Sequence, residues 1–142
     1  MHHITGLLFW SLIFFFQMTD SRLTGFSYER DPYVIDLKAK NFDNLVLHSN
    51  DVWAIEFYAL WCPACKRLAP EWSKTAENLK SEIRVGAVNI PYYPDLRARY
   101  QIWGFPTILI FAGDKTKPYT YKGPQSADAM SYYFRQIALA QT

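Results

Sequence analysis

Hydrophobic residues along this chain fall into short runs that alternate between two periodicities. Residues 52–59 (Val-Trp-Ala-Ile-Glu-Phe-Tyr-Ala) are rich in β-branched and aromatic side chains, which predicts a buried strand. Soon afterwards Leu68, Trp72, Ala76 and Leu79 recur at spacings of four, four and three residues, the apolar face of an amphipathic helix. A strand is therefore expected to lead directly into a helix near the middle of the chain.

The flanking segments continue this alternation, which is typical of an α/β domain. Apolar runs predict further strands at residues 33–37, 83–88, 107–111 and 118–121. Helices are predicted at residues 41–47, 94–100 and 126–139. Asn41 and Ser126 are suited to cap the first and last of these helices, and Pro70 is expected to kink the central one.

The first 32 residues differ in composition from the rest. Residues 7–16 form a compact apolar run, too short to span a bilayer comfortably, so residues 1–21 are predicted to be a secretory signal peptide. An uncleaved anchor or a buried helix remains the alternative. Residues 22–32 are polar and are expected to be a flexible segment in front of a domain over residues 33–142.

The second half of the chain has no apolar stretch near 18 residues, so no membrane span is expected apart from an uncleaved leader. The sequence ends without an anchor or a Lys-Asp-Glu-Leu type of retention signal. This ending predicts either a truncated form of a membrane-anchored protein or onward secretion. The 15 Lys and Arg residues are scattered, which argues against a nucleic-acid partner.

Cys62 and Cys65, the only cysteines, lie where the predicted strand meets the helix. Free N–H groups and the positive end of the helix dipole stabilise a thiolate at the first helical turn. Pro63 suits the first helical position, where a missing N–H costs no hydrogen bond. The pattern predicts that Cys62 attacks a disulfide and that Cys65 resolves the mixed disulfide.

Other uses of a cysteine pair fit this sequence less well. Structural zinc needs four ligands, and outside the leader only His48 could join the two cysteines. Haem attachment would require a histidine after the second cysteine, where Lys66 stands. No metal or other cofactor is therefore expected, and a static disulfide remains the structural alternative.

The segment from Glu56 to Trp72 (Glu-Phe-Tyr-Ala-Leu-Trp-Cys-Pro-Ala-Cys-Lys-Arg-Leu-Ala-Pro-Glu-Trp) resembles the active-site segment of a thioredoxin-superfamily domain of the protein disulfide isomerase type. Its Cys-Pro-Ala-Cys motif is most similar to that of the thioredoxin-related transmembrane oxidoreductases, which are membrane-anchored. The resemblance covers residues 33–139. It implies a thioredoxin fold, in which helices flank a central mixed β-sheet.

The resemblance also implies a substrate-binding loop. Gly104-Phe-Pro-Thr107 matches the family's Gly-x-Pro-Thr segment, whose proline is cis and faces the cysteines. A cis Phe105–Pro106 bond is therefore implied, with the Phe105 backbone free to pair with an extended client. Trp61, beside the nucleophile, is expected either to contact apolar client segments or only to pack.

Glu56 is an acid inside an otherwise apolar strand. Burial without a partner would raise the pKa of its carboxyl toward a range useful for proton transfer. The family's matching acid handles the proton of the resolving cysteine through a water molecule, and the resemblance therefore implies that Glu56 takes a proton from Cys65. A solvent-facing position on an edge strand is the alternative.

Three departures from the family pattern surround this site. Ala87 stands where many disulfide isomerase domains carry a lysine, and Pro124-Gln125 where they carry an arginine. Without these two positive charges, Glu56 is expected to be more protonated than the matching acid of those domains. Ala64 replaces the histidine of the Cys-Gly-His-Cys version, which predicts a less oxidising disulfide.

These observations predict a thiol–disulfide oxidoreductase that forms, reduces or isomerises disulfides in cysteine-containing client proteins. Its redox centre is the Cys62/Cys65 pair, and a monomer is expected. The expected location is the lumen of the endoplasmic reticulum or elsewhere in the secretory pathway, because disulfide clients accumulate in oxidising compartments. The competing class is a chaperone-like or secreted binding module with a static disulfide.

Overall fold

A five-stranded sheet organises the chain in a computed structural model, which describes residues 26–142. The predicted signal peptide over residues 1–21 lies outside the described residues. The spatial order of the strands is β1-β3-β2-β4-β5. The strands are β1 (Ile35–Leu37), β2 (Trp53–Tyr58), β3 (Arg84–Asn89), β4 (Thr107–Phe111) and β5 (Tyr119–Tyr121).

The sheet is mixed, as the resemblance implied. β3 pairs in parallel with both β1 and β2, whereas β4 pairs antiparallel with β2 and β5. β2 is thus the central strand, and all six of its residues are buried. The β4–β5 hairpin turns at Gly113, whose φ of 58° is a left-handed conformation that glycine adopts without strain.

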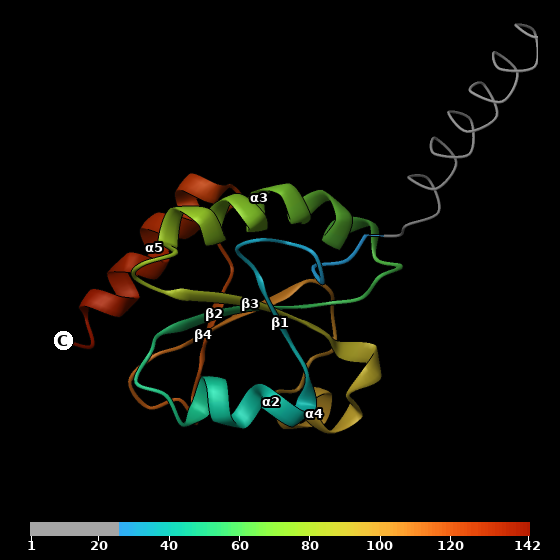
Figure 1. The fold of residues 1–142 in the computed structure, drawn as a ribbon, viewed down its shortest axis with the longest axis horizontal. Coiled ribbons are helices and arrows are strands. Elements are labelled where there is room, and N and C mark those ends of the chain that lie inside the picture. Colours follow the sequence, from blue (N-terminus) through green and yellow to red (C-terminus); the bar gives the residue numbers. More distant parts are fainter. Residues whose placement is uncertain (1–25) are drawn as a thin grey trace, which may run out of the picture.

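Helices cover both faces of the sheet (Figure 1). α3 and α5 lie on one face, and α2 and α4 lie on the other. The helices are α2 (Ala39–Phe42), continued by a π-helical turn (Asp43–Leu47), α3 (Pro63–Leu79), α4 (Pro94–Arg99) and α5 (Ala127–Leu139), with a 3-10 turn at Ile90–Tyr92.

The alternation of β2 side chains divides the core into two clusters. Ala54 and Tyr58 join the cluster under α3 and α5, where Trp72 meets Phe134 edge to face. The intervening residue Phe57 joins the cluster under α2 and α4. Since Glu56 alternates with Phe57, its carboxyl is directed to the α3 side of the sheet.

Most predicted elements are present, and one helix begins earlier than expected. The helix expected from Asn41 begins at Ala39, because the Asn41 side chain accepts the Lys38 N–H at 2.8 Å and closes the first turn from inside the helix. Ser126 caps α5 as predicted, accepting the Ala129 N–H at 3.2 Å. Pro70 lies inside α3, which is helical from Pro63 to Leu79, and the expected kink stays a prediction.

Within residues 26–142 no helix combines the length and apolarity needed to cross a bilayer.

Candidate active site

Cys62 and Cys65 occupy the start of α3, as the sequence predicted. Cys62 is the N-cap residue and Pro63 the first helical residue, and both cysteines are free thiols. The Cys62 sulfur accepts the Cys65 N–H at 3.2 Å, so a backbone donor of the first turn is directed at this sulfur. Cys62 is 4% exposed and Cys65 0%, and the pair is therefore reached from solvent through Cys62.

The loop before β4 faces the first sulfur. The Phe105–Pro106 peptide bond is cis, as the resemblance implied, and the Cys62 thiol donates to the Phe105 carbonyl with a sulfur–oxygen distance of 3.6 Å. The hydroxyl of Thr107 donates to the Gly104 carbonyl at 2.7 Å and ties the loop together. In this dithiol form the Phe105 carbonyl is thus occupied by the thiol, in contrast to the free backbone that we expected.

Exposed aromatic rings lie next to this loop. Trp61 is 66% exposed and meets the Phe105 ring edge to face, with 5.5 Å between centroids. Trp103 is 76% exposed, and the Arg97 guanidinium lies 5.9 Å from its ring centroid and 5.8 Å from that of Phe105. The sequence identifies neither Trp103 nor Arg97 as part of this site, because only the fold brings α4 against this loop.

Glu56 lies at the middle of the central strand with 0% exposure, which excludes the solvent-facing alternative. Its neighbours in register are Ala87 on β3 and Ile108 on β4, so neither adjacent strand offers it a cation. Burial raises the pKa of the Glu56 carboxyl to about 8, as the sequence predicted in direction. Oε1 has no hydrogen-bond partner among the described residues.

Cys65 shares this buried environment. Burial, the neighbouring Cys62 sulfur and the charge of Glu56 all raise the pKa of the Cys65 thiol above its ordinary range. Such a thiol holds its proton at neutral pH and becomes a good nucleophile only when a base removes the proton. The arrangement therefore pairs a proton-holding thiol with a nearby carboxyl whose pKa lies near neutrality.

Tyr28 is a further residue of this site that the sequence did not identify. Its hydroxyl donates to Glu56 Oε2 at 2.5 Å, and its side chain is 2% exposed. This burial differs from the flexible segment that we expected over residues 22–32. A single tyrosine among Ser27, Glu29 and Arg30 gives no periodic signal, so nothing in the local pattern could have identified it.

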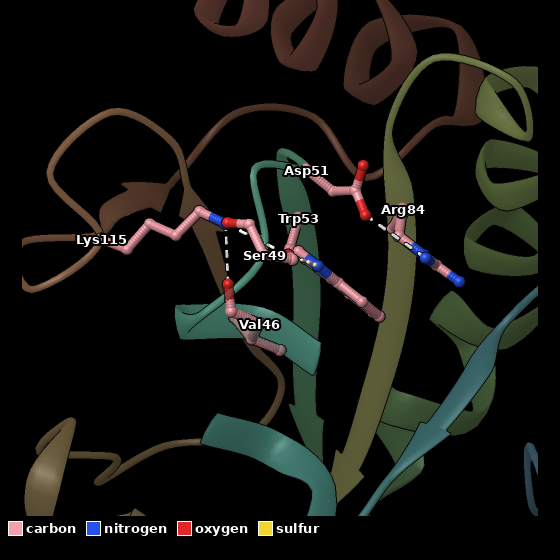
Figure 2. A network of polar contacts seen from close by, with 6 residues as sticks. All are labelled: Val46, Ser49, Asp51, Trp53, Arg84 and Lys115. Atoms are coloured by element: carbon pink, nitrogen blue, oxygen red, sulfur yellow. Dashed lines mark hydrogen bonds and ion pairs between the residues drawn. The ribbon is translucent and has the colours of Figure 1, made fainter. Parts of the chain in front are cut away.

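A cavity of about 810 Å³ lies at the other end of the sheet, among the segments before β2 and after β4. Lys115 borders it and donates to the carbonyls of Val46 at 2.7 Å and Ser49 at 2.6 Å (Figure 2). Arg84 pairs with Asp51 at 3.3 Å in the same view. Within residues 26–142 no group of three or more His, Cys, Asp or Glu side chains is placed to hold a metal ion.

A family model described as thioredoxin matches residues 33–136. Protein disulfide-isomerase 2-3 of Arabidopsis thaliana is 44% identical over 103 residues, which are 72% of this chain and 23% of that protein. Protein disulfide-isomerase A6 of Homo sapiens is 42% identical over 103 residues, with the same two shares of 72% and 23%. The chain thus spans less than a quarter of the length of these curated relatives.

Solved structures support the same fold. The J-Trx1 fragment of ERdj5 superposes with a TM-score of 0.74 at 28% identity, covering 80% of this chain and 54% of that one. The Trx4 domain of ERdj5 gives a TM-score of 0.64 at 25% identity, covering 73% of this chain and 94% of that one. The predicted thioredoxin fold is therefore confirmed, while the finer likeness to transmembrane oxidoreductases stays a prediction.

Proposed function

This chain belongs to the thioredoxin family, and from that membership we propose that it is a thiol–disulfide oxidoreductase acting on cysteine-containing client proteins. The observation that carries the proposal is the geometry of the pair at the start of α3. A backbone N–H is directed at the Cys62 sulfur, and Cys65 lies buried one turn behind it. Curated relatives that are named protein disulfide-isomerases support the same activity.

The proposed reaction proceeds through two exchanges at sulfur. The Cys62 thiolate attacks one sulfur of a client disulfide, forming a mixed disulfide and releasing the other client sulfur as a thiolate, which takes up a proton. Cys65 then loses its proton and attacks the Cys62 sulfur. The mixed disulfide breaks, and the client sulfur leaves as a thiolate that takes up a proton. The client has then gained two electrons and carries two thiols, while Cys62 and Cys65 have lost two electrons and are joined in a disulfide. Run in reverse, the same steps oxidise a client.

Glu56 is the proposed proton acceptor for Cys65. The charge of the carboxylate acts on Cys65, and no other buried carboxyl lies among the described residues. Oε1, which lacks a partner there, is the oxygen available to receive the proton. A carboxyl with a pKa of about 8 exchanges protons readily near neutral pH.

Trp61, Phe105 and Pro106 form the proposed client-binding surface. The rings of Trp61 and Phe105 present apolar area beside the Cys62 sulfur, where an unfolded segment would dock. The cis Pro106 lies in the loop that contacts this sulfur. Main-chain pairing along this loop would accept many client sequences, as a general oxidoreductase requires.

We place the activity in the secretory pathway, in the lumen of the endoplasmic reticulum, with the protein acting as a monomer that needs no cofactor. Only an oxidising compartment supplies disulfide-containing clients in number. The domain boundaries at residues 22 and 33 stay predictions. Secretion beyond this compartment also stays a prediction.

The direct test is insulin reduction with dithiothreitol, comparing the wild-type protein with Cys62→Ser. Wild type should accelerate the precipitation of insulin chains, and Cys62→Ser should fall to the uncatalysed rate. Lys117→Ala is the matched control, since this exposed side chain lies in the hairpin loop at the opposite end of the sheet. Client binding by wild type without any turnover would instead support the binding module with a static disulfide.

A further inference from the structure

Tyr28 and Glu56 form a buried polar pair between two segments that lie 28 positions apart in the chain. Tyr28 precedes β1, whereas Glu56 lies at the middle of β2. A hydroxyl and a carboxyl that are both withdrawn from water gain most of their stabilisation from each other, because neither has solvent as an alternative partner. Their 2.5 Å separation is that of a close hydrogen bond between two oxygens.

Aromatic packing holds the Tyr28 ring in place. The ring meets Phe26 edge to face with 5.0 Å between centroids, and it meets Tyr58 in the same way at 5.1 Å. Because neighbours on two sides restrict the ring, its hydroxyl reaches Glu56 from a defined direction. The carboxyl is thereby left with one bonded oxygen, Oε2, and one oxygen without a partner among the described residues, Oε1.

The groups that act on this pair come from several elements. β3 and β4 present apolar side chains to Glu56, as described above, and α3 presents the Cys65 thiol. The Tyr58 ring on β2 packs against that of Tyr28, and the charges of two further acids, Asp36 on β1 and Glu29 in the first described segment, act on the Tyr58 hydroxyl. None of these titratable groups is a cation. The Tyr28 hydroxyl therefore donates the hydrogen bond to Glu56 that a cationic side chain would otherwise donate.

We propose that Tyr28 is a positioning residue for proton transfer, whose hydroxyl holds Oε2 of Glu56 so that Oε1 remains available to accept the proton of Cys65. This inference rests on the oxidoreductase function proposed above. In the resolving step the proton leaves the Cys65 sulfur and goes to Glu56, while the proton of Tyr28 stays on its own oxygen.

The electrostatics support this division of roles. Burial and then the charge of Glu56 raise the pKa of Tyr28 far above its ordinary value, so Tyr28 acts as a donor and never as the base. The bond from Tyr28 lowers the pKa of Glu56 against the larger, opposite effect of burial. Without the hydroxyl, Glu56 would remain protonated to higher pH and would accept the Cys65 proton less readily.

The test follows the protonated carboxyl band of Glu56 by infrared spectroscopy during a pH titration of the reduced protein. The band is identified by its loss in Glu56→Gln. In Tyr28→Phe the midpoint should rise by about one pH unit, a tenfold change in proton affinity of the kind that one hydrogen bond to a charged group produces. Tyr58→Phe, which removes a hydroxyl from the adjacent buried ring, should leave the midpoint within a few tenths of a unit.

A midpoint in Tyr28→Phe that is unchanged or lower, or an equal shift in Tyr58→Phe, would overturn the proposal. Should Tyr28→Phe fail to fold, a fluorinated tyrosine placed at position 28 keeps the ring and makes the hydroxyl a stronger donor. The midpoint must then fall, and a rise or no change would refute the role. Because the titration needs no turnover, insulin reduction by wild type separately decides the fate of the proposed function.

Discussion

The two ends of the central strand differ in how their polar groups are satisfied. Toward the cysteine end, where β2 finishes at Tyr58, Oε1 of the buried Glu56 carboxyl lacks a partner within the described chain, and the rings of Trp61 and Trp103 are exposed. At the lysine end, where β2 begins at Trp53, the ammonium group of Lys115 donates hydrogen bonds to two backbone carbonyls beside the cavity of about 810 Å³.

The difference teaches that cavity size and density of charge do not locate the chemistry in this fold. A polar group whose hydrogen-bonding positions are filled by the protein, such as the Lys115 ammonium, stabilises one conformation and is not free to react. At the cysteine end, by contrast, the carboxyl with an unpartnered oxygen is able to accept a proton, and the two free thiols at the start of α3 are able to exchange electrons. Substitutions at the cysteine end should therefore change chemistry, and those at the lysine end should change stability.

The largest effect is expected from Cys65→Ser. Removing the resolving thiol leaves Cys62 able to attack but unable to release the client, so mixed disulfides should accumulate while insulin turnover falls to the uncatalysed rate. Non-reducing electrophoresis and mass spectrometry would detect the adduct. Cys62→Ser is the matched variant and should form none. Wild-type turnover by Cys65→Ser would show that resolution uses some other thiol.

Glu56→Gln should change the pH dependence of stability. With a pKa near 4.5 in the unfolded chain and about 8 in the folded protein, the folded state binds more protons between these values. The contribution of Glu56 to stability is thus full below pH 4.5, and it is lost as the pH rises through about 8. The total loss is on the order of 4 to 5 kcal/mol, at about 1.4 kcal/mol per pKa unit.

Urea denaturation of the reduced protein at several pH values would measure this effect as the difference between wild type and Glu56→Gln. The glutamine variant has no carboxyl to ionise, and its free energy of unfolding should therefore fall less over that interval. Parallel curves for the two proteins would mean that Glu56 ionises equally easily in both states, and its burial would then have no electrostatic consequence.

How far the sequence predicts this site depends on the range of the interactions. The strand over 52–59 and the helix after Cys62 follow from local periodicity, and both are confirmed. Burial of Glu56 follows from its apolar strand. The cis peptide bond at Pro106 came only from family resemblance, and the Tyr28 contact came from neither, because it depends on how a non-periodic segment packs against a strand far along the chain.

At the lysine end, Lys115→Ala should lower the free energy of unfolding by about 1 to 3 kcal/mol, the range for losing hydrogen bonds to a charged group. The ammonium donates to the carbonyl of Val46, inside the π-helical turn, and to that of Ser49, two residues after the turn ends at Leu47. Denaturation at pH 7 measures the change, and insulin reduction should stay at the wild-type rate. Lys117→Ala, with an exposed side chain, should change stability by less than about 0.5 kcal/mol. A fall in turnover with Lys115→Ala would contradict the separation of the two ends.

The smallest effect is expected from Asp51→Asn. The Asp51–Arg84 pair spans 3.3 Å, but both side chains are about half exposed, so water and salt screen the attraction. The change in unfolding free energy should be less than about 0.5 kcal/mol at low salt and should vanish in 1 M salt, roughly where the screening length falls to 3 Å. Arg84 also lies over the Trp53 ring, at 5.2 Å from its centroid, and that contact survives in Asp51→Asn. A fall of more than about 1 kcal/mol in the free energy of unfolding of Asp51→Asn would mean that the ion pair stabilises this end of the sheet. We expect instead that the hydrogen bonds from Lys115 stabilise it.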